Sequence, residues 1–178
     1  LSQNRLDGLF FNTGIFTNLS QDHLDYHKNI KAYFKAKLYL FEKLIKKNGN
    51  IITDEKIPAF NKIKSIAFNK NLKLFSLLDK KNNFQFLSHQ YEGDSQLLEI
   101  KYNNSIHKIK LNLIGKIQLK NVLMAVIASI KSNINIKDIL NVIPKINSVE
   151  GRFEKVGKIK NNAKVILDYA HTPDALKT

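Results

Sequence analysis

The chain has 178 residues, 43% of them hydrophobic, which is enough to bury the core of one domain and part of a second. It contains no cysteine, so disulfides and thiolate metal sites are excluded. The net charge of +14 comes from lysines dispersed along the whole chain rather than from a block of like charges, so we do not expect nucleic-acid binding.

The two ends and the apolar runs limit where the protein acts. No apolar run approaches the roughly 20 residues of a membrane span. The first residues do not resemble a signal peptide, so we expect a cytoplasmic protein without membrane insertion. The chain begins at Leu1 without an initiator methionine, and we expect it to start inside a longer protein.

The first 70 residues predict strands that alternate with helices. Apolar residues recur at helical spacing from Ile30 to Lys47, and Asn48-Gly49 is typical of a helix end. The predicted elements are a strand in 12–18, a polar loop at 20–29, a helix at 30–47, strands at 50–53 and 65–68, and a short helix at 57–63.

The second half changes from alternating strands to helices. Three short, partly alternating runs separated by Asn- and Gly-rich turns predict an antiparallel meander. An apolar helix follows a turn at Gly115. The predicted elements are strands at 84–87, 97–102 and 106–111, helices at 119–132 and 136–142, a linker at 144–151, and strands at 153–156 and 165–167. Strand and helix segments together predict an α/β fold.

The first cluster of chemically active side chains is a short loop that contains Asp22, His23, Asp25 and His27. Imidazole and carboxylate groups together can bind a divalent cation or transfer a proton. Lys37 lies on the apolar stripe of the following helix, and carbamylation would turn it into an anionic oxygen ligand for magnesium. Taken alone, the same residues also fit a hydrogen-bonded turn and a lysine that extends to solvent.

Residues 17–27 (Thr-Asn-Leu-Ser-Gln-Asp-His-Leu-Asp-Tyr-His), followed by Tyr-Phe-Lys-Ala-Lys at 33–37, closely resemble the signature of the Mur ligase family, MurE branch. The resemblance implies that His23 helps to bind magnesium and that Lys37 is carbamylated and supports a second magnesium ion. The opening residues resemble the end of another family segment, which implies that Gln3 and Arg5 contact the UDP-MurNAc-dipeptide substrate.

Three further segments extend the resemblance. Residues 113–121 are similar to the family's Gly-x-Phe-Asn-x-x-Asn and imply an adenine contact for Asn121, although Ile117 and Gln118 depart from the pattern. Without the resemblance, Asn121 would be taken for a helix cap. Two segments near the end resemble Gly-Arg-Met-Glu-x-Val and Val-Val-Asp-Tyr-Ala-His-Thr-Pro-Asp-Ala-Leu. They imply that Arg152 reaches the ATP phosphates, that Asp168 contacts the ribose, and that Tyr169, His171 and Thr172 line the nucleotide site.

The family's phosphate-binding loop, Gly-Thr-x-Gly-Lys-Thr, has no counterpart in the chain. The resemblance therefore implies the second half of a Mur ligase central ATPase domain at 1–147, with a mixed sheet flanked by helices and a small antiparallel sheet. The start of a Rossmann-like C-terminal domain would follow at 148–178. We expect this 178-residue chain to be inactive by itself.

The activity implied by the resemblance is an ATP- and Mg²⁺-dependent amide-bond ligation. The D-Glu carboxylate of UDP-MurNAc-L-Ala-D-Glu would form an acyl-phosphate, which the amine of meso-diaminopimelate or L-lysine then attacks. The product is a peptidoglycan precursor, so the implied role is in cell-wall synthesis, cell shape and cell division. The family leads us to expect a monomer.

Other functions fit parts of the sequence. A folylpolyglutamate synthase shares the lysine and a related histidine loop, and the ligase half of cyanophycin synthetase is more distantly similar. Residues 22–27 and 168–173 favour the muramyl branch. A basic nucleic-acid-binding module would need clustered cations and exposed aromatics, and a noncatalytic remnant would not be expected to keep His23, Lys37 and Arg152.

Overall fold

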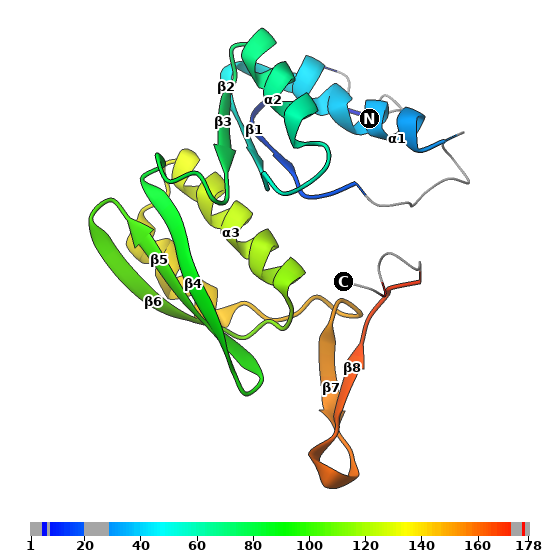
Figure 1. The fold of residues 1–178 in the computed structure, drawn as a ribbon, viewed down its shortest axis with the longest axis vertical. Helices are drawn as coiled ribbons and strands as arrows, with labels where there is room; N and C mark the ends of the chain where they lie inside the picture. The colour runs from blue at the N-terminus through cyan, green and yellow to red at the C-terminus, as the bar shows by residue number, and fades with distance from the viewer. Residues whose placement is uncertain (1–4, 7, 20–28, 172–175, 177–178) are drawn as a thin grey trace. The chain divides into compact units, whose positions relative to one another are not determined.

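The computed structural model describes residues 5–6, 8–19, 29–171 and 176 (Figure 1). Its contacts divide the chain into two compact units, Leu1–Asp79 and Lys80–Thr178, which are described separately below. No helix in these described stretches combines the length and the apolar character needed to cross a membrane.

The first unit is a three-stranded parallel sheet covered by helices. The strand order is β1-β2-β3, with β1 at Phe11–Phe16, β2 at Ile45–Thr53 and β3 at Lys73–Ser76. Helix α1 (Ile30–Tyr39) continues into the π-helical segment η1 (Leu40–Leu44), and α2 (Phe60–Asn69) precedes β3. Parallel strands need such crossover connections.

The core of this unit lies between the sheet and its helices. It is built from apolar side chains of β1, α1, η1, β2 and α2, which exclude water from both layers. Its buried members are Phe16, Leu38, Phe41, Ile45, Ile51, Ala59, Ile63, Ile66, Ala67 and Leu72.

Several predictions in this unit are wrong. Strand β3 was not predicted, and the helix predicted at 57–63 instead spans Phe60–Asn69. The helix predicted to extend to Lys47 ends at Leu44, because Ile45 takes extended backbone angles and pairs with Phe11 in the sheet. Ile45 is buried in the strand as well, so in the sequence it continues the apolar pattern of the helix although it belongs to β2. The strand predicted at 65–68 lies inside α2, where Ile63, Ile66 and Ala67 form one buried helical stripe.

The second unit contains the predicted antiparallel meander, β4 (Phe84–Glu92), β5 (Ser95–Tyr102) and β6 (Ser105–Leu111). Helix α3 (Lys116–Lys131) lies beside this sheet (Figure 1) and buries six apolar side chains. Helix α4 (Ile136–Val142) has the predicted bounds, and a 3-10 turn, η2 (Ile143–Lys145), follows it.

The chain then forms a two-stranded antiparallel hairpin, β7 (Glu154–Lys158) and β8 (Lys164–Leu167), joined through a short 3-10 turn, η3 (Lys160–Asn162). Both strands were predicted to within two residues. The α/β class and the small antiparallel sheet are confirmed.

Candidate functional site

Helix α1 places Lys37 near the carboxyl end of strand β1. The helix begins after Asn29, whose side-chain oxygen accepts a hydrogen bond from the backbone N–H of Ala32 at 2.9 Å. Two turns later, the Lys37 ammonium donates to the backbone carbonyl of Asn18, at 3.1 Å. Asn18 follows β1, so the lysine joins the helix to the segment beyond the strand.

Two aromatic rings face the Lys37 ammonium. Its Nζ lies 4.7 Å from the centre of the Tyr33 ring and 5.8 Å from that of Phe16. Phe34 packs edge-on against Phe16, with the ring centres 6.1 Å apart. The side chain is partly buried, as its place on the apolar stripe predicted. Ring faces and a carbonyl oxygen both favour a cation.

The surroundings of Lys37 are also compatible with a carbamate in one respect. A lysine carbamate keeps one N–H, which can still donate to the Asn18 carbonyl, whereas its negative charge would lose the attraction of the two rings.

Of the other residues predicted in the first unit, Gln3 and His23 lie outside the described residues, and Arg5 is exposed. Within the described part of the chain, no group of three or more His, Cys, Asp or Glu side chains could hold a metal ion.

Polar side chains that the sequence did not single out gather at the carboxyl end of the parallel sheet. Thr53, at the end of β2, donates its hydroxyl to the Phe16 carbonyl at 2.8 Å. Asp54 follows it, fully buried, and accepts a hydrogen bond from the Lys56 N–H at 3.0 Å. Ser76, at the end of β3, donates to Glu55. In open α/β sheets this edge is where ligands bind.

In the second unit, Asp168 closes the base of the β7–β8 hairpin. Its Oδ1 accepts hydrogen bonds from the backbone N–H groups of Phe153 (3.2 Å) and Tyr169 (3.0 Å). The Tyr169 N–H also donates to the Gly151 carbonyl, at 2.8 Å. Phe153 and Gly151 both have positive φ angles, so the chain turns sharply as it enters β7. The carboxylate thus joins the start of β7 to the end of β8.

Arg152, Tyr169 and His171 stack at the same base. The Arg152 guanidinium lies 4.7 Å from the centre of the Tyr169 ring. The His171 ring meets Tyr169 edge-on at 5.0 Å, and its Nδ1 is 2.8 Å from the Tyr169 carbonyl oxygen. The structure therefore brings together four residues predicted from the terminal motifs, Arg152, Asp168, Tyr169 and His171. Thr172 lies outside the described residues.

Asn121 lies on the exposed surface of α3, within the helix. It is not a cap, because Gly115 occupies the N-cap position and the helix begins at Lys116. Gly115 has a φ of 91°, and the ring of Phe153 lies against it, 3.8 Å from where a Cβ would stand. The start of α3 and the base of the hairpin are therefore in contact.

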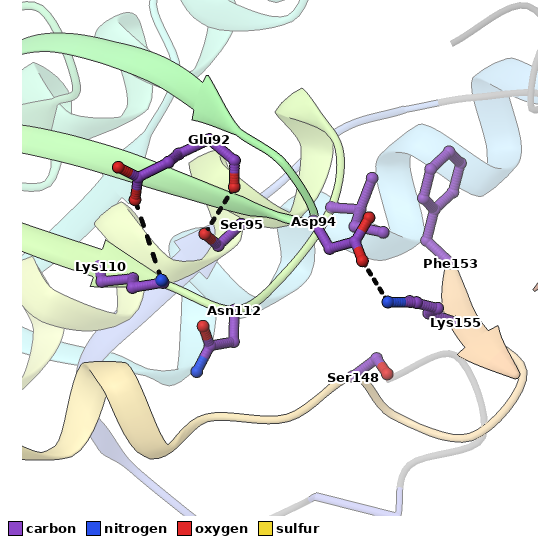
Figure 2. Close-up of a pocket in the computed structure, with 9 residues that line it drawn as sticks. Glu92, Asp94, Ser95, Lys110, Asn112, Ser148, Phe153 and Lys155 are labelled. Atoms are coloured by element: carbon purple, nitrogen blue, oxygen red, sulfur yellow. Dashed lines mark hydrogen bonds and ion pairs between the residues drawn. The ribbon is translucent and has the colours of Figure 1, made fainter. Parts of the chain in front are cut away.

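A cavity of about 350 Å³ opens where the hairpin meets the β4–β5 turn (Figure 2). Its walls carry both signs of charge, including Glu92, Asp94, Lys110 and Lys155, with Phe153 on one side. None of the residues predicted from the motifs lines it.

The model of the Mur ligase middle domain matches residues 1–129, well over half of the sequence. The chain belongs to the Mur ligase family. That match includes the segment before β1, the whole parallel sheet, the meander and most of α3.

Named relatives of this Mur ligase chain are similar along its whole length. It is 33% identical over 177 residues to the UDP-N-acetylmuramoyl-L-alanyl-D-glutamate–2,6-diaminopimelate ligase of Zymomonas mobilis. The alignment covers 99% of this chain and 36% of that protein. The chain thus spans about a third of the length of the curated relatives that it matches.

Solved structures agree on the fold. A ligase of the same printed name has a TM-score of 0.76 at 24% identity, covering 98% of this chain and 36% of that one. The MurF ligase of Thermotoga maritima in complex with ADP has a TM-score of 0.72 at 16% identity, covering 94% of this chain and 38% of that one. The Mur ligase fold expected from the sequence is confirmed.

Sequence reasoning missed two kinds of site residue in this Mur ligase. Helical spacing placed Tyr33 on the same stripe as Lys37, four residues before it, but the contact of its ring with the ammonium was not predicted. The contributions of Asn18 and Phe153 depend on backbone atoms and a positive φ angle, for which the sequence holds no signal.

Proposed function

We propose that the chain is part of an ATP-dependent ligase that adds the third amino acid to UDP-MurNAc-L-Ala-D-Glu in peptidoglycan precursor synthesis. The observation that carries this proposal is the 33% identity to a diaminopimelate ligase along 99% of the chain. The printed names of the relatives favour 2,6-diaminopimelate over lysine as the amino acid added. The lack of cysteine suits the reducing cytoplasm that we propose as its compartment.

We assign residues 1–147 to the central domain of this ligase and 148–178 to the start of its C-terminal domain. The middle-domain match ends at residue 129, inside α3, and α4 and η2 complete the helical layer before the linker. The β7–β8 hairpin then belongs to the second domain.

In the proposed enzyme, Lys37 and His23 would hold magnesium, with Lys37 contributing through a carbamate. Bound magnesium would offset the negative charge that builds on the transferred phosphoryl group. The position of Lys37 at the carboxyl end of a parallel sheet supports this role, as does the N–H that a carbamate keeps for the Asn18 carbonyl. Gln3 and Arg5 would bind the muramyl dipeptide, where an arginine suits a carboxylate or phosphate.

The base of the hairpin would bind ATP. Arg152 supplies a permanent positive charge for the phosphates, and Tyr169 holds its guanidinium in place. Asp168 Oδ1 is bonded to backbone N–H groups, which orients the carboxylate for a ribose hydroxyl. Asn121 would contact the adenine, and His171 would close the site. The similarity in fold to an ADP complex supports nucleotide use.

The first prediction concerns Lys37. In the protein as its gene encodes it, Lys37→Ala should lower the rate of ligation by about 100-fold or more, because a charged group that stabilises phosphoryl transfer is lost. Lys37→Arg should be equally inactive, since arginine keeps the positive charge over Tyr33 but cannot form a carbamate. Both rates are measured as product formed from UDP-MurNAc-L-Ala-D-Glu, ATP, Mg²⁺ and diaminopimelate.

Lys35→Ala is the matched control, because Lys35 is exposed on the same helix. It should keep the wild-type rate. A fully active Lys37→Arg protein would contradict the carbamate, and a fully active Lys37→Ala protein would remove Lys37 from the chemistry altogether. The carbamate itself is tested by crystallography, because acid would release it before mass spectrometry. A crystal structure obtained with bicarbonate and Mg²⁺ should show carbamate density on Lys37.

A folylpolyglutamate synthase-like activity is the alternative within the superfamily. Likeness of fold does not separate the two branches, whereas the named relatives along the whole chain favour the muramyl substrate. Turnover of a folate with glutamate, and none of the muramyl dipeptide, would reverse the assignment.

A further inference from the structure

The β7–β8 hairpin has little apolar attachment to the rest of its unit. The apolar side chains on its two strands and their connection, including Val156, Ile159 and Leu167, are exposed. Phe153, at its entry, is the side chain that lies against the start of α3. Burial of apolar area therefore does little to fix the direction of the hairpin.

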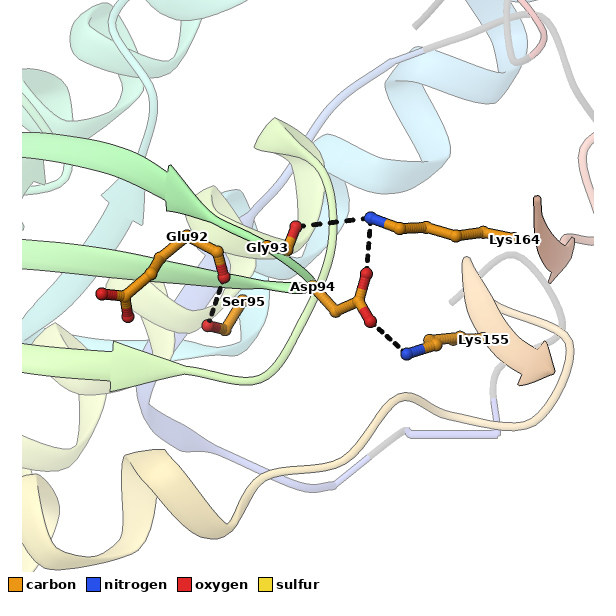
Figure 3. A network of polar contacts seen from close by, with 6 residues as sticks. All are labelled: Glu92, Gly93, Asp94, Ser95, Lys155 and Lys164. Carbon is orange, nitrogen blue, oxygen red and sulfur yellow. Dashed lines mark hydrogen bonds and ion pairs between the residues drawn. The ribbon is translucent and has the colours of Figure 1, made fainter. Parts of the chain in front are cut away.

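Polar contacts fix it instead, and they converge on Asp94 in the β4–β5 turn (Figure 3). One carboxylate oxygen pairs with Lys155 on β7, and the other lies 2.5 Å from the Nζ of Lys164 on β8. Lys164 also donates to the Gly93 carbonyl, at 3.4 Å. A single carboxylate thus holds both strands of the hairpin.

The β4–β5 turn is itself well fixed. Ser95 donates its hydroxyl to the Glu92 carbonyl at 2.9 Å, and Gly93 supplies the positive φ angle that the turn requires. About a third of the Asp94 side chain is exposed, at 32%, and Lys155 is similar at 34%. Isolated surface ion pairs contribute little to stability. Here one carboxylate, carried by a well-fixed turn, is shared by two lysines, and this restricts the positions of both lysines more strongly than a single pair would.

The hairpin carries the proposed nucleotide-binding residues at its base. Lys155 lies three residues after Arg152 on the same segment, and Lys164 lies four residues before Asp168. The Phe153 N–H donates to Asp168 across the base, and this bond should open more often when the two strands are no longer clamped. A rotation of the hairpin would displace Arg152 and Asp168 at once.

We propose that Asp94 is a positioning residue of the ligase, which clamps the hairpin through Lys155 and Lys164 and so orients Arg152 and Asp168 toward the nucleotide. This inference rests on the proposed function, because it assigns the base of the hairpin to ATP. Asp94 itself does not touch the substrate in this role. It acts through the direction of the hairpin.

The test is Asp94→Asn in the gene-encoded protein, which keeps the shape of the side chain and removes its charge. Glu92→Gln is the matched control, because Glu92 ends β4 directly before the same turn and pairs with Lys110 of β6 at 3.8 Å, not with the hairpin. Two quantities are measured. One is amide hydrogen exchange of the hairpin without nucleotide, and the other is the split between KM for ATP and kcat.

Asp94→Asn should speed hydrogen exchange at Phe153 and Tyr169 and raise KM for ATP, each about three- to fivefold, as expected for a partly exposed ion pair. The value of kcat should change less, and Asp94→Glu should restore part of the loss. Lys164→Gln should have a similar effect, and combining it with Asp94→Asn should add little, since both remove one interaction.

Three results would overturn the clamp: unchanged exchange in Asp94→Asn, the same changes in Glu92→Gln, or faster exchange with an unaltered KM for ATP. If Asp94→Asn does not fold, the comparison of Lys164→Gln with Glu92→Gln decides the same point. A wild-type protein that neither binds nor turns over ATP would contradict the proposed function. The hydrogen-exchange comparison would still show whether Asp94 holds the hairpin.

Discussion

At the scale of single residues, Gly49 shows how closely the chain packs at the irregularity in β2, where the register with β1 shifts between Ile45 and Asn50. It lies buried in β2, and a Cβ at this position would come within 2.8 Å of the backbone oxygens of Asn12 and Lys46. Backbone atoms of a sheet cannot move aside as a flexible side chain can. Gly49→Ala should therefore lower the free energy of unfolding by about 2–3 kcal/mol, as overpacking does in a core.

The measurement for Gly49→Ala is the denaturant midpoint at constant slope. Gly157→Ala in β7 is the control, because open space surrounds a Cβ there and its φ angle is not positive. It should leave the midpoint within about 0.5 kcal/mol of the wild type. Equal stability of the two variants would mean that β1 and β2 separate more easily than their contacts indicate.

Short motifs singled out Lys37, Arg152, Asp168 and His171 as candidate site residues, and their roles stay predictions. What the motifs could not give is how each one is held. The Lys37 ammonium is held by a backbone carbonyl, and Asp168 is held by two backbone N–H groups. Such contacts depend on the path of the chain and not on the identity of the partner residue.

At the scale of elements, the electrostatics of the Asp94 contact give a pH dependence. Hydrogen bonds from Lys155 and then from Lys164 lower the pKa of Asp94 from 3.8 to about 2. Because the pKa in the folded protein is depressed, the contact contributes fully above about pH 3.8 and is lost as the pH falls toward 2. The same cavity contains Glu92 and Lys110, which pair with each other.

Carboxyl carbon shifts measured by NMR should therefore give Asp94 a midpoint near pH 2, below its ordinary 3.8. Replacement of Lys155 by Gln should raise that midpoint, since its hydrogen bond is the largest cause of the shift. Replacement of Lys110 by Gln, a lysine beside the same cavity, should change it much less. An Asp94 midpoint of 3.8 in the wild type would mean that the lysines do not hold the carboxylate in solution.

The type of an element was predicted correctly where its segment carried a single clear pattern of apolar residues and turns. The meander and α4 were predicted because turns and alternation, or a short helical stripe, were unambiguous. Ile45 and residues 65–68 were misassigned because buried apolar residues occur at helix and strand spacing alike in a short run. The contact of Asp94 with Lys155 joins residues 61 positions apart, and pairing at that range is decided by the fold.

At the scale of the whole molecule, the chain contains two kinds of candidate site in two separate units. Lys37 and the carboxyl end of the parallel sheet belong to Leu1–Asp79, and Asn121, Arg152 and Asp168 belong to Lys80–Thr178. Phosphoryl transfer requires metal ligands and nucleotide contacts to act on the same phosphates. The proposed reaction therefore depends on how the two units are held in the complete enzyme.

The last prediction concerns these 178 residues expressed by themselves. They contain no Gly-x-x-Gly-Lys segment, the backbone loop with a lysine that cradles the phosphates in ligases of this kind. Without that loop, the contacts proposed for Arg152 and Lys37 should not suffice to hold the triphosphate in line for transfer, because positioning accounts for most of the catalysis in phosphoryl transfer. The 178-residue chain should release no phosphate from ATP above background, with or without the muramyl dipeptide. The gene-encoded protein should release phosphate only when the muramyl dipeptide and diaminopimelate are both present. ATP turnover by the 178 residues alone would mean that other residues of the chain bind the phosphates, and the proposed role of Arg152 would have to be revised.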